Sequence, residues 1–168
     1  LRHQFTRVPL RIRHPRGELS GQQIDAFVQH HDILPTALGI MGLEAPERVT
    51  GRNIWPVAAA GRSDDVESVF IGWSRYCSVR TRDYNLILPL WEDNIDGPGV
   101  RELYDLRNDP DELVNVIDDY PTIARELAEL AQEYIRTQAP LTKGAIQEPD
   151  AKTMRDAAIT FDALPEVR

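Results

Sequence analysis

The chain has 168 residues, of which 42% are hydrophobic and 27% are charged, and its formal net charge is −8. This size and composition fit one globular domain, or one domain with a small annex, that can bury a core without disulfides. The negative charge argues against a nucleic-acid partner, because phosphates would be repelled. No apolar run approaches the roughly 20 residues that a membrane-spanning helix needs, so we expect no membrane partner either.

Cys77 is the single cysteine, so no internal disulfide can form and no oxidising compartment is required. This favours a cytoplasmic over a secreted location. Cys77 lies in a predicted strand, which favours a buried, unreactive thiol over a reactive one. The first residue is Leu1 rather than Met, and we expect the chain to be a piece of a longer protein.

The first part of the chain, residues 1–62, is predicted to contain two short strands. Apolar residues alternate with others from Val8 to Arg13 and again over Ile24–Val28, as in strands with one apolar face. Pro9 would place the first strand at the edge of a sheet or at its own beginning.

A helix is predicted next, over residues 33–43, because Leu34, Leu38 and Met41 recur at helical spacing. Asp32 is the expected N-cap, and Gly42 marks the end. A loop should follow to about residue 65, with at most a single helical turn near residues 51–56.

Five arginines gather in the first sixteen residues of this acidic chain: Arg2, Arg7, Arg11, Arg13 and Arg16. One interpretation is the solvated face of a strand. The other is an anion-binding surface, because the guanidinium group suits sulfate, phosphate and carboxylate. The residues leave both open.

The second part, residues 63–138, is predicted to form a small antiparallel sheet and a helix. Four strands at hairpin spacing are expected at Val66–Trp73, Tyr76–Arg80, Asp83–Leu90 and Arg101–Leu106. The helix should run from Thr122 to about Gln138 and end before Pro140. Its apolar stripe (Ile123, Leu127, Leu130, Ala131 and Tyr134) favours packing on the sheet over a binding groove. We expect residues 139–168 to be an extended tail, with a short helix near Lys152–Ala158.

Between the last strand and this helix lies Glu102–Asn115, which reads E-L-Y-D-L-R-N-D-P-D-E-L-V-N. Pro110 fixes its own φ and moves Asp109 away from helical geometry, so the chain must turn there. Asn108 and Asp109 can stabilise such a turn through their own backbone.

No complete catalytic constellation is present in the sequence: there is no Gly-rich phosphate loop, no G-x-S-x-G and no H-E-x-x-H. The one compact ligand-like cluster is His30-His31-Asp32. Adjacent histidines at a strand end would point to opposite sides, and capping explains Asp32, so a structural role is favoured over a functional one. We therefore predict no catalytic residue and no metal ligand in this chain.

The stretch at Glu102–Asn115 resembles the late E-L-Y-D-L-x-x-D-P-x-E-x-x-N motif of the sulfatases, in the alkaline phosphatase superfamily. Three other segments are similar to sulfatase segments, in the same order: R-V-P-L-R-I-R-H-P at Arg7–Pro15, H-D-I-L-P-T-A-L at His31–Leu38 with T-G-R-N at Thr50–Asn53, and S-V-R-T-R-D-Y-N-L-I at Ser78–Ile87. The resemblance covers the chain to about Gln138.

The resemblance implies the C-terminal portion of an α/β sulfatase: the last strand or strands of its central sheet, then a four-stranded antiparallel sheet packed by a helix. Such enzymes hydrolyse sulfate esters with a formylglycine, made from Cys or Ser in a C/S-x-P-x-R segment, and a divalent cation, usually calcium. Cys77 does not match that segment. We expect the isolated chain to be inactive and to bind no cofactor. Its partner would be the missing N-terminal α/β region of the same enzyme. The full enzyme would act on a small anionic ester.

Two alternatives stay open. The chain could be part of a phosphonate or phosphate monoester hydrolase, or a non-catalytic anion-binding or interaction module with the same fold. Asn85 stands where the resembled hairpin has a lysine, a position that we expect to be exposed or near the substrate. The apolar edge at Val8–Arg13 predicts self-association of the isolated chain.

Overall fold

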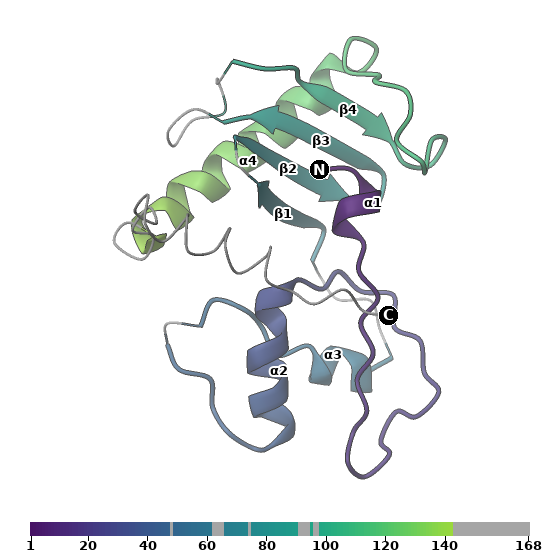
Figure 1. The fold of residues 1–168 in the computed structure, drawn as a ribbon, viewed down its shortest axis with the longest axis vertical. Coiled ribbons are helices and arrows are strands. Elements are labelled where there is room, and N and C mark those ends of the chain that lie inside the picture. The colour runs from purple at the N-terminus through teal and green to yellow at the C-terminus, as the bar shows by residue number, and fades with distance from the viewer. Residues whose placement is uncertain (48, 62–65, 74, 91–94, 96–97, 143–168) are drawn as a thin grey trace, which may run out of the picture.

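The computed structural model describes residues 1–142, except residues 48, 62–65, 74, 91–94 and 96–97. A four-stranded sheet carries helix α4 on one face and the short helix α1 on the other (Figure 1). A second part, made of helices α2 and α3 and long loops, lies beyond the β1 edge of this sheet. No helix of the described part is long and apolar enough to cross a membrane.

The sheet has the expected strands in the expected order. They are β1 (Ser68–Trp73), β2 (Tyr76–Thr81), β3 (Tyr84–Pro89) and β4 (Glu102–Asp105), each antiparallel to its sequence neighbour. The tight connection between β2 and β3 follows from Thr81, whose hydroxyl accepts the N–H groups of Asp83 at 3.3 Å and Tyr84 at 2.9 Å. The predicted antiparallel sheet, and with it the α+β class, is confirmed.

The hydrophobic core lies between the sheet and α4 (Pro121–Thr142). Its buried members come from alternate positions of β2, β3 and β4 and from one stripe of the helix: Cys77, Val79, Leu86, Leu88, Leu103, Leu127 and Ala131. Phe70 of β1 stacks on Tyr134 with ring centroids 4.1 Å apart. The stripe therefore packs on the sheet as predicted, except that Leu130 is 46% exposed.

Helix α4 does not end before Pro140 but continues to Thr142. A proline inside a helix removes one backbone hydrogen bond and disfavours the helical region for the residue before it, which was the basis of the prediction. The first residues of the expected tail thus belong to the helix. The short helix expected near Lys152–Ala158 lies outside the described residues.

The described residues before β1 form four short helices: α1 (His3–Thr6), η1 (His30–Asp32), α2 (Ile33–Ile40) and α3 (Trp55–Ala59). The predicted strands at Val8–Arg13 and Ile24–Val28 are wrong for this chain, because none of the described residues there belongs to a strand. A strand needs a neighbour for its N–H and C=O groups, and the described chain offers neither segment one.

Asp32 is buried, but it does not cap α2 as predicted. Its carboxylate accepts the backbone N–H of Gln29 at 2.9 Å, closing a capping box at the start of η1, and the N–H of Arg52, also at 2.9 Å. The Thr36 hydroxyl donates to the Asp32 carbonyl at 2.6 Å and accepts the N–H of Ile54, just before α3, at 3.1 Å. The helix α2 itself stops at Ile40, earlier than expected, with Gly42 at φ +74°.

Candidate functional site

Part of the sheet face opposite α4, here called the polar face, carries polar side chains, whereas Val69 and Ile87 on the same face are apolar. Strand register places Arg80 beside Asn85, and Asn85 beside Tyr104, so these three side chains lie next to one another on three strands. Ser78 and Glu102 belong to the same face. Asn85 is completely buried, and the Ser78 hydroxyl donates to its side-chain oxygen.

The turn after β4 brings one more residue to this face. The Asp105 carbonyl accepts the N–H groups of Asn108 at 3.2 Å and Asp109 at 2.7 Å, which confirms the predicted turn. The Asp109 carboxylate then accepts two further N–H groups, those of Leu113 and Val114, each at 2.8 Å. Between these bonds Glu112 adopts φ +57°, a left-handed conformation that is uncommon for a residue other than glycine.

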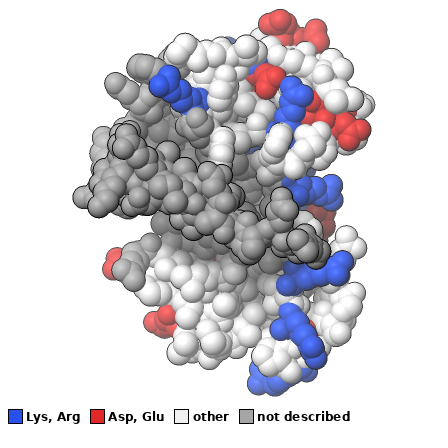
Figure 2. Space-filling model, in the orientation of Figure 1, with Lys and Arg blue, Asp and Glu red and all other residues white. Residues whose placement is uncertain are grey.

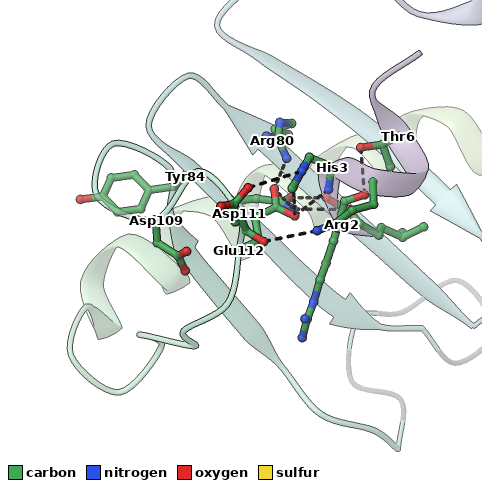
Figure 3. Close-up of polar contacts among 12 residues, drawn as sticks. Arg2, His3, Thr6, Arg80, Tyr84, Asp109, Asp111 and Glu112 are labelled. Carbon is green, nitrogen blue, oxygen red and sulfur yellow. Dashed lines mark hydrogen bonds and ion pairs between the residues drawn. The ribbon is translucent and has the colours of Figure 1, made fainter.

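The Glu112 side chain is fully buried against the polar face (Figure 3). Its Oε1 accepts hydrogen bonds from the Arg80 guanidinium and, at 3.3 Å, from the Asn85 amide. Its Oε2 accepts the backbone N–H of His3 at 2.7 Å. A buried carboxylate is costly unless it is paired and hydrogen-bonded, and Glu112 satisfies both conditions.

Residues 1–3 lie across this face. The Asn85 amide donates to the carbonyl of Leu1 at 3.3 Å, and the Arg2 guanidinium donates to Glu102 at 3.1 Å. Arg2 also lies over the ring of Tyr104, 5.1 Å from its centroid. Residues 1–3 are therefore bound to the sheet and its following turn through the Leu1 carbonyl, the Arg2 side chain and the His3 N–H.

Two side chains of the sheet have pKa values raised mainly by burial. Burial, together with the hydrogen bond that Tyr104 donates to Glu102 at 2.8 Å, raises the pKa of the Tyr104 hydroxyl to about 12. Burial in the core raises the pKa of the Cys77 thiol to about 11, which is the unreactive thiol that its strand position predicted.

Asn85 is not exposed, because the residue is completely buried and its amide is enclosed by Ser78, Glu112 and Leu1. Its nearness to the substrate stays a prediction. Sequence reasoning also missed Glu112, which looked like one more residue of an acidic loop. The signal was available: Glu112 is the E of D-P-x-E, and Arg80 is the R of V-R-T, two resembled motifs with opposite charges.

The cluster His30-His31-Asp32 stays apart from this network. Asp32 is engaged by backbone N–H groups, and the nearest approach of His31 is 3.8 Å, from Nε2 to Asp32 Oδ1. Among the described residues no group of three or more His, Cys, Asp or Glu side chains could hold a metal ion. The described part thus does not fit the divalent cation that the resemblance implies for a whole enzyme.

Each polar residue named on this face has a partner within the chain. The Glu112 carboxylate has no exposed surface and both of its oxygens are used, so it cannot bind a ligand or move a proton in this arrangement. The hydrogen bonds of this network join the sheet, the turn after β4 and residues 1–3.

Comparison with known proteins identifies the fold. Residues 1–139 match the family described as N-sulphoglucosamine sulphohydrolase, C-terminal. The chain belongs to this sulfatase family. It corresponds to the C-terminal portion of sulfatases, as the resemblance implied.

Several sulfatases are similar to this chain in sequence. An uncharacterized sulfatase of Escherichia coli K12 is 37% identical over 129 residues, which are 68% of this chain and 23% of the relative. Human arylsulfatase K is 32% identical over 129 residues, 71% of this chain and 24% of its own length. The N-acetylglucosamine-6-O-sulfatase of Bacteroides thetaiotaomicron is 28% identical over 141 residues, 76% of this chain and 24% of its length.

Solved structures agree. A protein solved in complex with its substrate D-glucosamine-2-N,6-O-disulfate aligns with a TM-score of 0.53 at 25% identity, over 72% of this chain and 25% of its own. A putative sulfatase from Bacteroides fragilis has the same fold, with a TM-score of 0.55 at 21% identity, over 67% of this chain and 26% of its own. The chain spans about a quarter of the length of these relatives.

Proposed function

We propose that this chain serves as the C-terminal part of a hydrolase of sulfate esters, whose catalytic groups lie in a larger α/β region. The observation that carries the proposal is the match of residues 1–139 to the C-terminal sulfatase family. The sequence supports it, because it contains no C/S-x-P-x-R segment from which a formylglycine could form. The calcium ion and the formylglycine would belong to the larger region.

The surface of the part before β1 supports a large partner. Aliphatic side chains there are exposed to an extent unusual for a folded domain: Val8 by 59%, Leu10 by 44%, Ile12 by 44%, Leu34 by 53% and Met41 by 62%. We infer that the α/β region covers them. The segment Val8–Arg13, which has strand periodicity but no partner among the described residues, would then pair with the central sheet.

A chimera tests the proposal. Residues 1–139 would replace the matching quarter of the Bacteroides N-acetylglucosamine-6-O-sulfatase, and release of sulfate from its 6-O-sulfated sugar would be measured. We expect a folded chimera to release sulfate, and the 168-residue chain alone to hydrolyse no aryl sulfate. A folded chimera without activity, or turnover by the chain alone, would overturn the proposal. A phosphate monoester assayed in parallel distinguishes the variant that cleaves phosphate esters.

A second candidate, a non-catalytic anion-binding module, is favoured by one observation. Arg7, Arg11 and Arg13 are exposed and have no ion-pair partner within the described part, and blue side chains line one edge of the lower half of Figure 2. Titration of the chain with sodium sulfate, followed by NMR, tests it. Saturable shifts over residues 7–16 that Arg11→Ala weakens would support it, and their absence would exclude it.

A further inference from the structure

We propose that Glu112 is a positioning residue that anchors the N-terminal segment, residues 1–6, to the polar face of the sheet. The contact that does this is the hydrogen bond from the His3 backbone N–H to Glu112 Oε2, at 2.7 Å. It joins residues 109 positions apart, and it is made to a carboxylate with no exposed surface. Hydrogen bonds to charged groups are stronger than those between neutral groups.

The carboxylate is preorganised before the segment arrives. Arg80 and Asn85 hold Oε1, while the Asp109 carboxylate and the left-handed backbone of Glu112 hold the loop from which the side chain projects. Oε2 is left to face the segment (Figure 3). The two most polar residues of the D-P-D-E turn thus have one combined effect, which is to present a fixed acceptor.

The segment contributes a matching donor. His3 is the first residue of α1, so its N–H has no partner within the helix. The helix has four residues and would not persist alone, so its order depends on this docking. From Arg7 the chain leaves the sheet and enters the part that contains α2 and α3 (Figure 1).

Other contacts join that part to the sheet near β1 and at the β2–β3 turn. Gln29 donates to the Phe70 carbonyl at 2.7 Å, and Arg82 donates to the Asp25 carboxylate at 3.0 Å. Glu112 adds a further contact over β2 and β3, where its carboxylate meets Arg80 and Asn85. The anchor would therefore fix the direction in which the chain passes from the sheet to the region that, in the proposed function, meets the α/β core.

The test compares two substitutions of one residue in the full chain. His3→Pro removes the N–H and places the ring carbon where it pointed, and it suits both the first helical position and the extended backbone of Arg2, at φ −76° and ψ 163°. His3→Ala removes the imidazole and keeps the N–H. NMR hydrogen exchange of the Phe5 and Arg7 amides, which bond the carbonyls of Arg2 and His3, reports the order of α1.

We expect His3→Pro to speed the exchange of Phe5 and Arg7 about tenfold relative to Leu86 in the core, and His3→Ala to leave the ratio near that of the unmodified chain. Glu112→Gln should act like His3→Pro, because one of its two side-chain oxygens becomes an NH₂ group. Equal exchange in His3→Pro and His3→Ala would overturn the proposal. So would Glu112→Gln speeding the core amides as much as the segment. Neither result measures hydrolysis, so failure here leaves the proposed function untouched.

Discussion

The side chain of Asn115 forms hydrogen bonds with the backbone beside Leu103, at the edge of the sheet where no further strand pairs with β4 among the described residues. Its oxygen accepts the N–H of Leu103 at 2.9 Å, and its amide donates to the carbonyl of Arg101 at 3.1 Å. The Val116 N–H then bonds the Leu103 carbonyl at 2.8 Å. Strand β4 is the edge of the sheet, and these bonds occupy the groups that an edge strand would otherwise expose.

Replacing Asn115 should therefore destabilise the sheet edge. We expect Asn115→Ala to lower the free energy of unfolding by about 1–3 kcal/mol, since the N–H of the buried Leu103 loses its partner. Urea denaturation followed by circular dichroism measures the change. Asn115→Asp is the comparison variant, because it keeps the oxygen that accepts the Leu103 N–H but puts a charged acceptor opposite the Arg101 carbonyl. An Asn115→Ala loss below about 0.5 kcal/mol would contradict the prediction.

Two leucines of α4 allow a direct test of the core. Leu127 is 7% exposed and belongs to the cluster under the sheet, whereas Leu130, on the same helix, is 46% exposed. We expect Leu127→Ala to cost about 2–5 kcal/mol and Leu130→Ala less than about 1 kcal/mol. Similar losses of unfolding free energy in thermal or urea denaturation would contradict the packing described above.

The Cys77 thiol should react slowly with thiol reagents. The rise of its pKa from the ordinary 9.0 to about 11 lowers the thiolate fraction about a hundredfold near pH 8. We expect labelling by a disulfide reagent to be at least that much slower than in the urea-unfolded chain. Equal rates would show that the thiol is accessible in the fold.

The raised pKa of Cys77 also makes the free energy of unfolding depend on pH. The folded state favours the protonated thiol, so its contribution is complete below pH 9 and is lost as the pH rises toward about 11. Cys77→Ala, compared with the unmodified chain between pH 8 and 11, should remove this part of the alkaline decline. A decline unchanged by the substitution would assign it to other groups.

The exposed aliphatic side chains before β1 predict self-association of the isolated chain. We expect the double substitution Leu10→Ser and Ile12→Ser to weaken association at least about tenfold in sedimentation equilibrium, because each side chain is about half exposed and aliphatic. The matched control is Leu113→Ser with Val114→Ser, which are 72% and 60% exposed on the turn after β4. A purely monomeric chain, or an equal effect of the control, would contradict the prediction.

The sheet could be predicted from sequence because its information is local. Alternation with period two at Tyr76–Arg80 and Asp83–Leu90, joined by a short polar turn, predicts a hairpin, and hairpin partners are neighbours in the chain. The same alternation at Val8–Arg13 gives no strand, because no described segment lies beside it to pair with. A pattern of side chains can show that a segment is suited to a strand, but not what it pairs with.

The acidic loop by itself does not show what Glu112 contacts, although the residue belongs to the resembled D-P-x-E motif. Its burial depends on Arg80 and Asn85 from another hairpin and on the N–H of His3, which only the tertiary structure brings within hydrogen-bonding distance. The burial of Asn85 was missed for the same reason: the resembled hairpin position was expected to be exposed or near the substrate, whereas here residues 1–3 cover it.

The sequence by itself determined the sheet, its order, the turn at Asn108–Pro110, the packing stripe of α4 and the sulfatase family. Each of these follows from spacing along the chain or from motifs in a fixed order. The tertiary structure decided that the Glu102–Asn115 stretch does more than connect the sheet to α4. Its Asn115 completes the sheet edge, and its Glu112 holds the first residues of the chain, because a buried carboxylate is stable only where distant donors converge on it.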